Sequence, residues 1–251
     1  MKALILAAGV GTRLQPLTLE IPKALIPVCG YPMLEIIIQR LIGAGFKEVI
    51  INLHHKSDQI KEFIESKNQF GIRIEYSDES ERLLDTGGAI KKASGLLSGK
   101  EDLLVHNVDI LTNLDYNSLI QYHKAQDARA TLAVKDRTTS RPLLVDARGI
   151  LRGWENPEKR IRIVTTESTR GLRQTAFSGV YVLSPAIFAD FPAEEVFGFM
   201  PWILDIAGSG GIQTWDQESA FWFEAGRLES LEQTSAKLVA GPSIPGFLAL
   251  K

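Results

Sequence analysis

Short apolar runs alternate with segments of helical spacing along the first part of the chain. Continuous apolar runs at residues 2–8 and 49–53 are typical of strands buried on both faces of a parallel sheet. Between them, apolar side chains recur at helical spacing from Met33 to Ile42, after a proline and before two glycines. This order of strand, helix and strand predicts a β-α-β unit.

The same alternation continues as far as residue 105. It predicts helices at about residues 57–66 and after Thr86, and strands at residues 72–76 and 103–105. Repeated units of this kind predict a single Rossmann-like α/β domain, with an open, doubly wound, mixed and mainly parallel sheet.

The pattern changes after Arg129, where the strands become shorter and their connections more polar. We therefore expect mixed or antiparallel additions to the sheet in this part of the chain. Two late helices are also expected. The predicted strands are 130–135, 143–146 and 174–183, and the predicted helices are 199–207 and 228–238.

Charge and composition exclude several classes of function. The formal charge of −2 offers no basic field for a nucleic-acid backbone, so we expect no nucleic-acid partner. The first apolar run is too short to span a bilayer, and we expect no membrane partner. Cys29 is the one cysteine of the sequence, which excludes an intramolecular disulfide framework and fits a cytoplasmic protein.

A glycine-rich turn at residues 6–14 follows the first strand, where ligands bind in open α/β sheets. Glycines allow backbone N–H groups to approach phosphate oxygens, and Arg13 can add a bidentate cationic contact. Lys23, held between two prolines, supplies a second charge. Leu14 occupies the position where a dinucleotide-binding fingerprint needs a third glycine, so the glycines alone are weak evidence. An ordinary strand-to-helix turn therefore remains the alternative to phosphate binding.

Residues 6–28 resemble the signature of the sugar-phosphate nucleotidyltransferases, Leu-Ala-Ala-Gly-x-Gly-Thr-Arg-Leu-x-Pro-Leu-Thr followed by Pro-Lys-Pro/Ala-Leu-x-Pro-Val. The likeness is to short members of the mannose-1-phosphate guanylyltransferase and N-acetylmuramate-1-phosphate uridylyltransferase types. It implies Mg²⁺-dependent transfer of a nucleoside monophosphate from an NTP to a sugar 1-phosphate, with release of pyrophosphate. It also implies a nucleotide-binding half at residues 1–128 and a sugar-phosphate-binding half at residues 129–251.

The resemblance extends to three further segments that imply base and metal contacts. Residues 84–90 are similar to a segment whose backbone approaches the nucleobase, although Thr86 could equally be a helix cap. Asp109 and Glu224 stand where the family has two aspartate ligands of Mg²⁺, with pairing to Arg227 as the alternative for Glu224. The implied catalytic residues are Arg13, Lys23 and Asp109. The implied nucleotide-binding residues are Leu6, Ala7, Ala8, Gly9, Gly11, Thr12, Arg13, Lys23, Asp85, Thr86, Gly87 and Gly88.

The acceptor side departs from the family pattern. Asn156 replaces the lysine of a Glu-Lys-Pro motif, and an amide cannot supply its charge. The implied substrate-binding residues are Asn107, Glu155, Asn156, Ser178 and Gly179. Together with Val108, which replaces a glycine of the family motif, and Glu224, this departure keeps open the alternative of a catalytically weak regulatory subunit that binds a nucleotide-sugar. A second alternative is cytidylyl transfer to a non-sugar phosphate such as phosphocholine, which would use the same glycine-rich loop with a different acceptor pocket. A homodimer is the default assembly.

Overall fold

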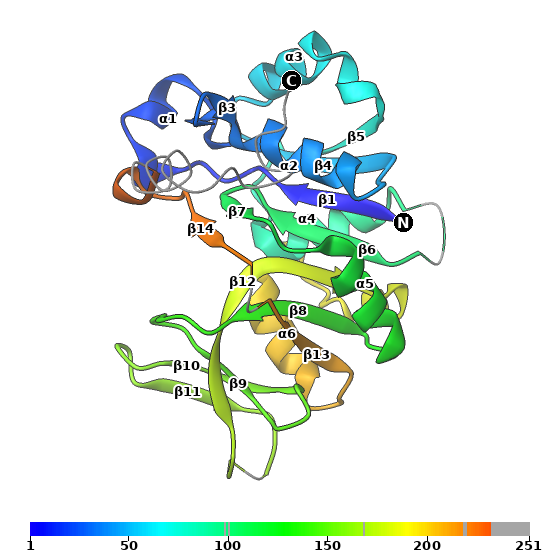
Figure 1. Ribbon diagram of the computed structural model, residues 1–251, viewed down its shortest axis with the longest axis vertical. Coiled ribbons are helices and arrows are strands. Elements are labelled where there is room, and N and C mark those ends of the chain that lie inside the picture. Colours follow the sequence, from blue (N-terminus) through cyan, green and yellow to red (C-terminus); the bar gives the residue numbers. More distant parts are fainter. Residues whose placement is uncertain (98, 100, 168, 218–219, 232–251) are drawn as a thin grey trace. The chain divides into compact units, whose positions relative to one another are not determined.

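The computed structural model shows two compact units of the chain (Figure 1). The first unit comprises Met1–Leu83, His106–Tyr116 and Ala220–Lys251, and the second comprises Leu84–Val105 and Asn117–Ser219. The structure describes residues 1–97, 99, 101–167, 169–217 and 220–231. These packing units differ in extent from the halves 1–128 and 129–251, whose assignment to two ligands stays a prediction.

Three parallel strands form the sheet of the first unit, and all three were expected from apolar runs or alternation. β1 (Lys2–Leu6) pairs with β4 (Glu48–Leu53), which pairs in turn with β5 (Arg73–Asp78). The side chains of β4 are buried from Val49 to Leu53, as its continuous apolar run predicts. All three strands therefore end on the same edge, where the connecting loops can carry a site.

Helices and short strands complete the first unit, and the two predicted helices are present. α2 (Met33–Gly43) and α3 (Ser57–Ser66) agree closely with the predicted ranges. The remaining elements are η1 (Thr12–Leu14), α1 (Leu17–Glu20), η2 (Lys23–Leu25), β2 (Pro27–Val28), β3 (Tyr31–Pro32), η3 (Asn68–Gly71), β7 (Ile110–Thr112) and β14 (Trp222–Glu224). β14 pairs antiparallel with β7, which brings a late segment of the chain beside residues 110–112.

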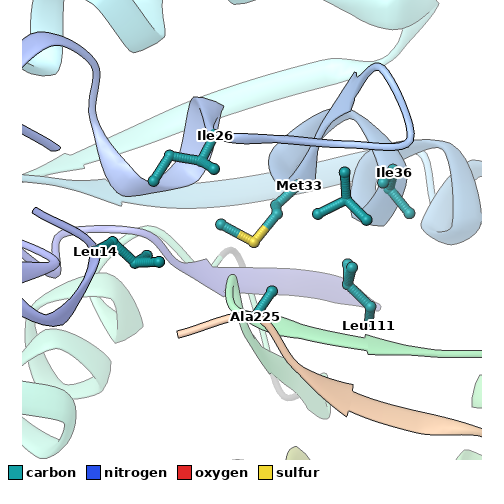
Figure 2. Packing of buried hydrophobic residues seen from close by; sticks show 7 residues of the cluster. Leu14, Ile26, Met33, Ile36, Leu111 and Ala225 are labelled. Atoms are coloured by element: carbon teal, nitrogen blue, oxygen red, sulfur yellow. The ribbon is translucent and has the colours of Figure 1, made fainter. Parts of the chain in front are cut away.

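A buried cluster joins the loops of this unit to one another (Figure 2). It contains apolar side chains from the turn after β1, from α2, from β7 and from the segment after β14. Its members are Leu14, Ile26, Val28, Met33, Ile36, Leu111 and Ala225. Because Leu14 follows Arg13 and Ala225 follows Glu224, the packing of these two apolar residues in one cluster holds their segments close together.

The second unit contains a mixed sheet. β12 (Arg173–Leu183) pairs antiparallel with β8 (Ala130–Lys135) and with β9 (Leu143–Val145), and β13 (Ile212–Asp216) pairs parallel with β8. The mixed pairing expected after Arg129 is thus confirmed. The other elements are α4 (Asp85–Ser94), α5 (Tyr116–Ala125), β10 (Leu151–Asn156), β11 (Ile161–Val164), η4 (Pro185–Asp190) and α6 (Phe199–Ala207).

β6 (Leu103–Asn107) begins in the second unit and ends in the first. The predicted α/β fold with a mixed sheet is confirmed, and α6 matches the predicted helix at 199–207. The helix expected at 228–238 is present from Leu228 to Leu231, and its remaining residues lie outside the described part of the chain.

Candidate functional site

The turn after β1 begins with two backbone N–H groups that are already bonded. Ala7 N and Ala8 N donate to Oδ1 of Asn52, at distances of 2.6 Å and 3.3 Å. Asn52 lies on β4 and is buried. The N–H groups of Ala7 and Ala8 are thus bonded within the protein, whereas Gly9 and Thr12 are exposed, and nucleotide binding by these residues stays a prediction.

Gly11 shapes the second part of the turn. Its φ of +70° lies in the left-handed region, which favours glycine. A Cβ at this position would lie 2.8 Å from Cγ2 of Thr18 and 3.1 Å from Cβ of Lys23. The Thr18 hydroxyl also donates to the Gly11 carbonyl at 3.0 Å. The absence of a side chain at Gly11 thus lets Lys23 pack directly against the turn.

Two ion pairs connect this turn with the acids that the sequence singled out. Lys23 Nζ lies 2.6 Å from Oδ2 of Asp109, and these side chains are only 12% and 14% exposed. Arg13 Nη1 lies 3.6 Å from Oε1 of Glu224, with side chains 53% and 41% exposed. The first pair is sheltered from solvent, whereas the second is open to solvent and more strongly screened by salt. The alternative pairing of Glu224 with Arg227 is not observed among the described contacts.

Gly226 lies where three of these charged groups meet. A Cβ at Gly226 would be 3.0 Å from Oδ2 of Asp109, 3.3 Å from Oε1 of Glu224 and 3.5 Å from Nη2 of Arg13. The neighbouring Ala225 N donates to the Asp109 carbonyl at 2.8 Å, which aligns the two segments. Two acids and two cations from four separate segments are therefore gathered within one unit.

The two carboxylates fit a hard divalent cation. Mg²⁺ prefers oxygen ligands and is commonly held by one or two carboxylates, with water or phosphate oxygens completing its shell. Among the described residues, no group of three or more Asp, Glu, His or Cys side chains could hold a metal ion. Asp109 and Glu224 would therefore need oxygens from water or from a phosphate ligand.

His106, three residues before Asp109, is buried beneath the site. Burial lowers the pKa of His106 to about 4, although its Nδ1 donates to the Asn107 carbonyl at 2.9 Å and favours the charged form. The ring packs edge-on against Tyr116, with centroids 5.8 Å apart. His106 is therefore neutral at physiological pH.

The predicted base-binding segment lies in the second unit, at the start of α4, where its glycines pack against a later part of the chain. Gly87 N and Gly88 N both donate to the Phe197 carbonyl, at 2.9 Å and 3.1 Å. A Cβ at Gly87 would overlap the Phe197 ring, and one at Gly88 would overlap the Glu195 carbonyl. Residues 195–197 pack directly against Gly87 and Gly88, and this close contact explains why neither position carries a side chain.

Thr86 and Asp85 remain exposed at the start of α4. Thr86 is not the helix cap, because α4 is preceded by Leu84 without a side-chain cap bond. Instead, the Thr86 hydroxyl accepts a hydrogen bond from Phe199 N at 2.9 Å. Contact of a base with Asp85 or Thr86 stays a prediction.

The predicted acceptor residues in the second unit already have partners. Glu155 contacts Arg162 Nε at 3.1 Å through Oε1, and its Oε2 accepts from Gln174 Nε2 at 2.7 Å. Asn156 is buried, and its Oδ1 accepts from Lys159 N at 3.1 Å, which closes the turn after β10. Asn156 therefore replaces a charge with a turn-forming amide, and Arg162 provides the nearby positive charge.

Ser178 and Gly179 lie at an irregularity of β12. The register between β12 and β8 shifts between Phe177 and Tyr181, and Gly179 has a φ of +74°. The Ser178 hydroxyl is fully buried and accepts from Gln217 Nε2 at 2.5 Å. Its role in the described structure is to anchor Gln217, so its contact with a sugar stays a prediction. Asn107, half-buried at the end of β6, belongs to the first unit.

Sequence reasoning missed Asn52 and the space at Gly226. Asn52 is the polar residue within the otherwise apolar run 49–53, and a buried amide in a strand signals a specific bonding task. Gly226 carries no side chain that could point to a role in the sequence. Its contribution depends on three loops meeting, which spacing along the chain does not reveal.

The fold and the site together define an α/β protein that gathers two cations and two carboxylates beyond the ends of parallel strands. A family model described as "Nucleotidyl transferase" matches residues 2–240, and the chain belongs to this family. The single match spans both compact units, in agreement with one domain.

Relatives support this assignment, and a solved structure shares the fold. Mannose-1-phosphate guanyltransferase of Hypocrea jecorina is 28% identical over 98% of this chain and 69% of its own length. UTP--glucose-1-phosphate uridylyltransferase of Synechocystis is 25% identical over 98% of this chain and 66% of its own length. HddC of Yersinia pseudotuberculosis has a similar fold, with a TM-score of 0.75 at 24% identity, covering 94% of this chain and 99% of HddC. Within the described residues, no helix is long and apolar enough to cross a membrane.

Proposed function

We propose that this protein transfers a nucleoside monophosphate from an NTP to a sugar 1-phosphate and releases pyrophosphate, with Mg²⁺ as its metal. The observation that carries the proposal is the convergence of Arg13, Lys23, Asp109 and Glu224 around Gly11 and Gly226. The family match and the names of the relatives supply the reaction class.

The reaction joins two polyanions, so charge repulsion is its main obstacle. An oxygen of the sugar 1-phosphate attacks the α-phosphorus, a new P–O bond forms, and the bond to the β-phosphate oxygen breaks with pyrophosphate leaving. The attacking oxygen is already ionised, and no protein nucleophile is required. Catalysis of such transfers is mostly alignment and electrostatic stabilisation.

The charged side chains divide this work between them. Asp109 and Glu224 would hold Mg²⁺, which supplies positive charge to the phosphate oxygens when bound. Lys23 carries three N–H donors, so it can keep its bond to Asp109 and still donate to a phosphate. The guanidinium of Arg13 is more exposed and suits bidentate contact with a phosphate.

A pyrophosphate-release assay with a panel of NTPs, sugar 1-phosphates and Mg²⁺ tests the proposal. Lys23→Ala and Asp109→Asn are each expected to lower turnover at least a hundredfold. A loss within about tenfold, worth only about 1.4 kcal/mol, would show that these roles are wrong.

Glu224→Asp should retain activity and Glu224→Gln should lose it, because only the aspartate keeps a charged oxygen ligand.

The two alternatives make different predictions in the same assay. A regulatory subunit would bind a nucleotide-sugar but release no pyrophosphate with any acceptor, and the turn-forming role of Asn156 is the observation that favours it. A cytidylyltransferase would accept phosphocholine in place of a sugar phosphate. The names of the relatives, which specify sugar 1-phosphates, favour the sugar acceptor.

A further inference from the structure

A buried amide near the end of β4 makes side-chain hydrogen bonds to the segments that follow β1 and β5. Asn52 is 3% exposed, and its Oδ1 accepts from both Ala7 N and Ala8 N. Its Nδ2 donates to Oε1 of Glu79 at 2.8 Å. A buried amide is tolerated only when its hydrogen bonds are made, so these contacts restrict where the turn after β1 can lie.

Glu79, the partner of Asn52, is itself fixed in place. It follows β5 and is 1% exposed, although it carries a carboxylate. Its N–H donates to the Leu53 carbonyl at 2.7 Å, and its carbonyl accepts from Nδ1 of His54 at 2.7 Å. One amide and one carboxylate thus link the segments that follow β1, β4 and β5.

We propose that Asn52 and Glu79 are positioning residues for the nucleotide, acting through the backbone of Ala7 and Ala8. This inference rests on the proposed function. The bond chain from Glu79 through Asn52 holds the first two residues of the turn, and Gly9 to Arg13 continue from that anchor. Because the N–H groups of Ala7 and Ala8 are occupied, the backbone donors for the triphosphate begin at Gly9.

The positioning role can be tested by exchanging donor and acceptor in the hydrogen bond between Asn52 and Glu79. Asn52→Leu keeps the branched shape of the side chain but removes both bonding functions, so that two backbone N–H groups lose their acceptor and Oε1 of Glu79 loses this donor. Asn52→Asp keeps the acceptor for Ala7 and Ala8 but puts two buried carboxylates side by side. Adding Glu79→Gln to Asn52→Asp restores a donor and an acceptor in the opposite order, with the original net charge.

The experiment measures the Kd of the NTP by titration calorimetry, and the KM of the NTP, the KM of the sugar 1-phosphate and kcat by pyrophosphate release. We expect Asn52→Leu and Asn52→Asp to raise the nucleotide Kd and KM at least tenfold, with the KM of the sugar 1-phosphate within threefold of wild type. The Asn52→Asp, Glu79→Gln double variant should return the nucleotide Kd to within threefold. Ser77→Ala is the matched control, because Ser77 is buried beside Asn52 in the register of β5 and its side-chain hydroxyl makes no hydrogen bond among the described residues.

The results distinguish failure of the positioning role of Asn52 and Glu79 from failure of the proposed nucleotidyl transfer. If wild type releases pyrophosphate but both single variants keep the wild-type nucleotide Kd, the positioning role is wrong and the proposed function stands. If the wild type binds no NTP, both are wrong. Urea unfolding shows whether each variant folds. If neither single variant folds, the double variant decides: failure of the double variant to recover the wild-type nucleotide Kd would overturn the inference.

Discussion

Gly226 illustrates how one missing side chain can set the geometry of a charged cluster. A Cβ at this position would lie within 3.5 Å of Asp109, Glu224 and Arg13, so a methyl group here would crowd all three charged groups. The site therefore depends on an absent side chain as well as on its charged ones.

Gly226→Ala should lower kcat/KM for the proposed reaction by about tenfold or more, because the new Cβ would crowd both carboxylates. The pyrophosphate assay checks this, and Mn²⁺ binding monitored by electron paramagnetic resonance should weaken in parallel. Gly43→Ala is the control, since a Cβ there meets no atom within 4 Å. Unchanged activity and Mn²⁺ affinity in Gly226→Ala would contradict the importance of this space.

His106 makes stability depend on pH at the level of a single residue. Its pKa of about 4 lies below the usual 6.5, so between these values the unfolded chain binds a proton that the folded chain does not. The contribution of neutral His106 to the free energy of unfolding is therefore fully present above about pH 6.5 and is lost as the pH falls toward 4. The loss should reach about 1.4 kcal/mol at pH 5.5 and about 3 kcal/mol near pH 4.

Urea unfolding between pH 7.5 and pH 5.5 measures this effect. His106→Asn should flatten the dependence, whereas His55→Asn, at an exposed position, should preserve it. Some slope will remain in His106→Asn, because burial also lowers the pKa of His123. An unchanged slope in His106→Asn would show that the histidine is not protected from protonation.

At the scale of elements, α4 depends on close contact with the segment 195–197. Gly88→Ala should destabilise the protein by at least about 2 kcal/mol, because its Cβ would overlap the Glu195 carbonyl and the backbone must shift. Gly95→Ala, at the C-cap of α4 and with a nearest contact of 3.4 Å, should change the free energy of unfolding by much less. Equal unfolding free energies for the two variants would contradict this packing.

Periodicity predicted the elements well, because each strand and helix buries a regular pattern of its own residues. The ranges of β4, α2 and α3 follow directly from local apolar spacing. The role of Gly87 and Gly88 did not follow, since their neighbour Phe197 lies more than a hundred residues later. Asn52 shows the same limit, because its partners Ala7 and Glu79 come from the segments that follow two other strands.

At the scale of the whole molecule, motif spacing identified the charged residues but not their pairing. The contact of Arg13 with Glu224 depends on the pairing of β14 with β7, and the contact of Lys23 with Asp109 joins residues that are 86 positions apart. The two compact units were also not predicted, because the first unit is assembled from three separate stretches of chain. The expected homodimer stays a prediction that analytical ultracentrifugation can test.

Nucleotide binding should raise the stability of the whole protein. At an NTP concentration of about 100 Kd, the added free energy is about 2.7 kcal/mol, which corresponds to a rise in Tm of roughly 5–10 °C. Differential scanning fluorimetry with NTP and Mg²⁺ measures this rise. Lys23→Ala should show a smaller rise at the same concentration, and an equal one would argue against contact of Lys23 with the triphosphate.

The late position of β14 in the chain also has a consequence for synthesis on the ribosome. Arg13, Lys23 and Asp109 leave the ribosome well before Glu224 and Gly226, by roughly ten seconds at ordinary elongation rates. During that interval β7 has no β14 to pair with, and Asp109 lacks the neighbouring acid. A nascent chain stalled before residue 220 would therefore be unable to complete the charged cluster.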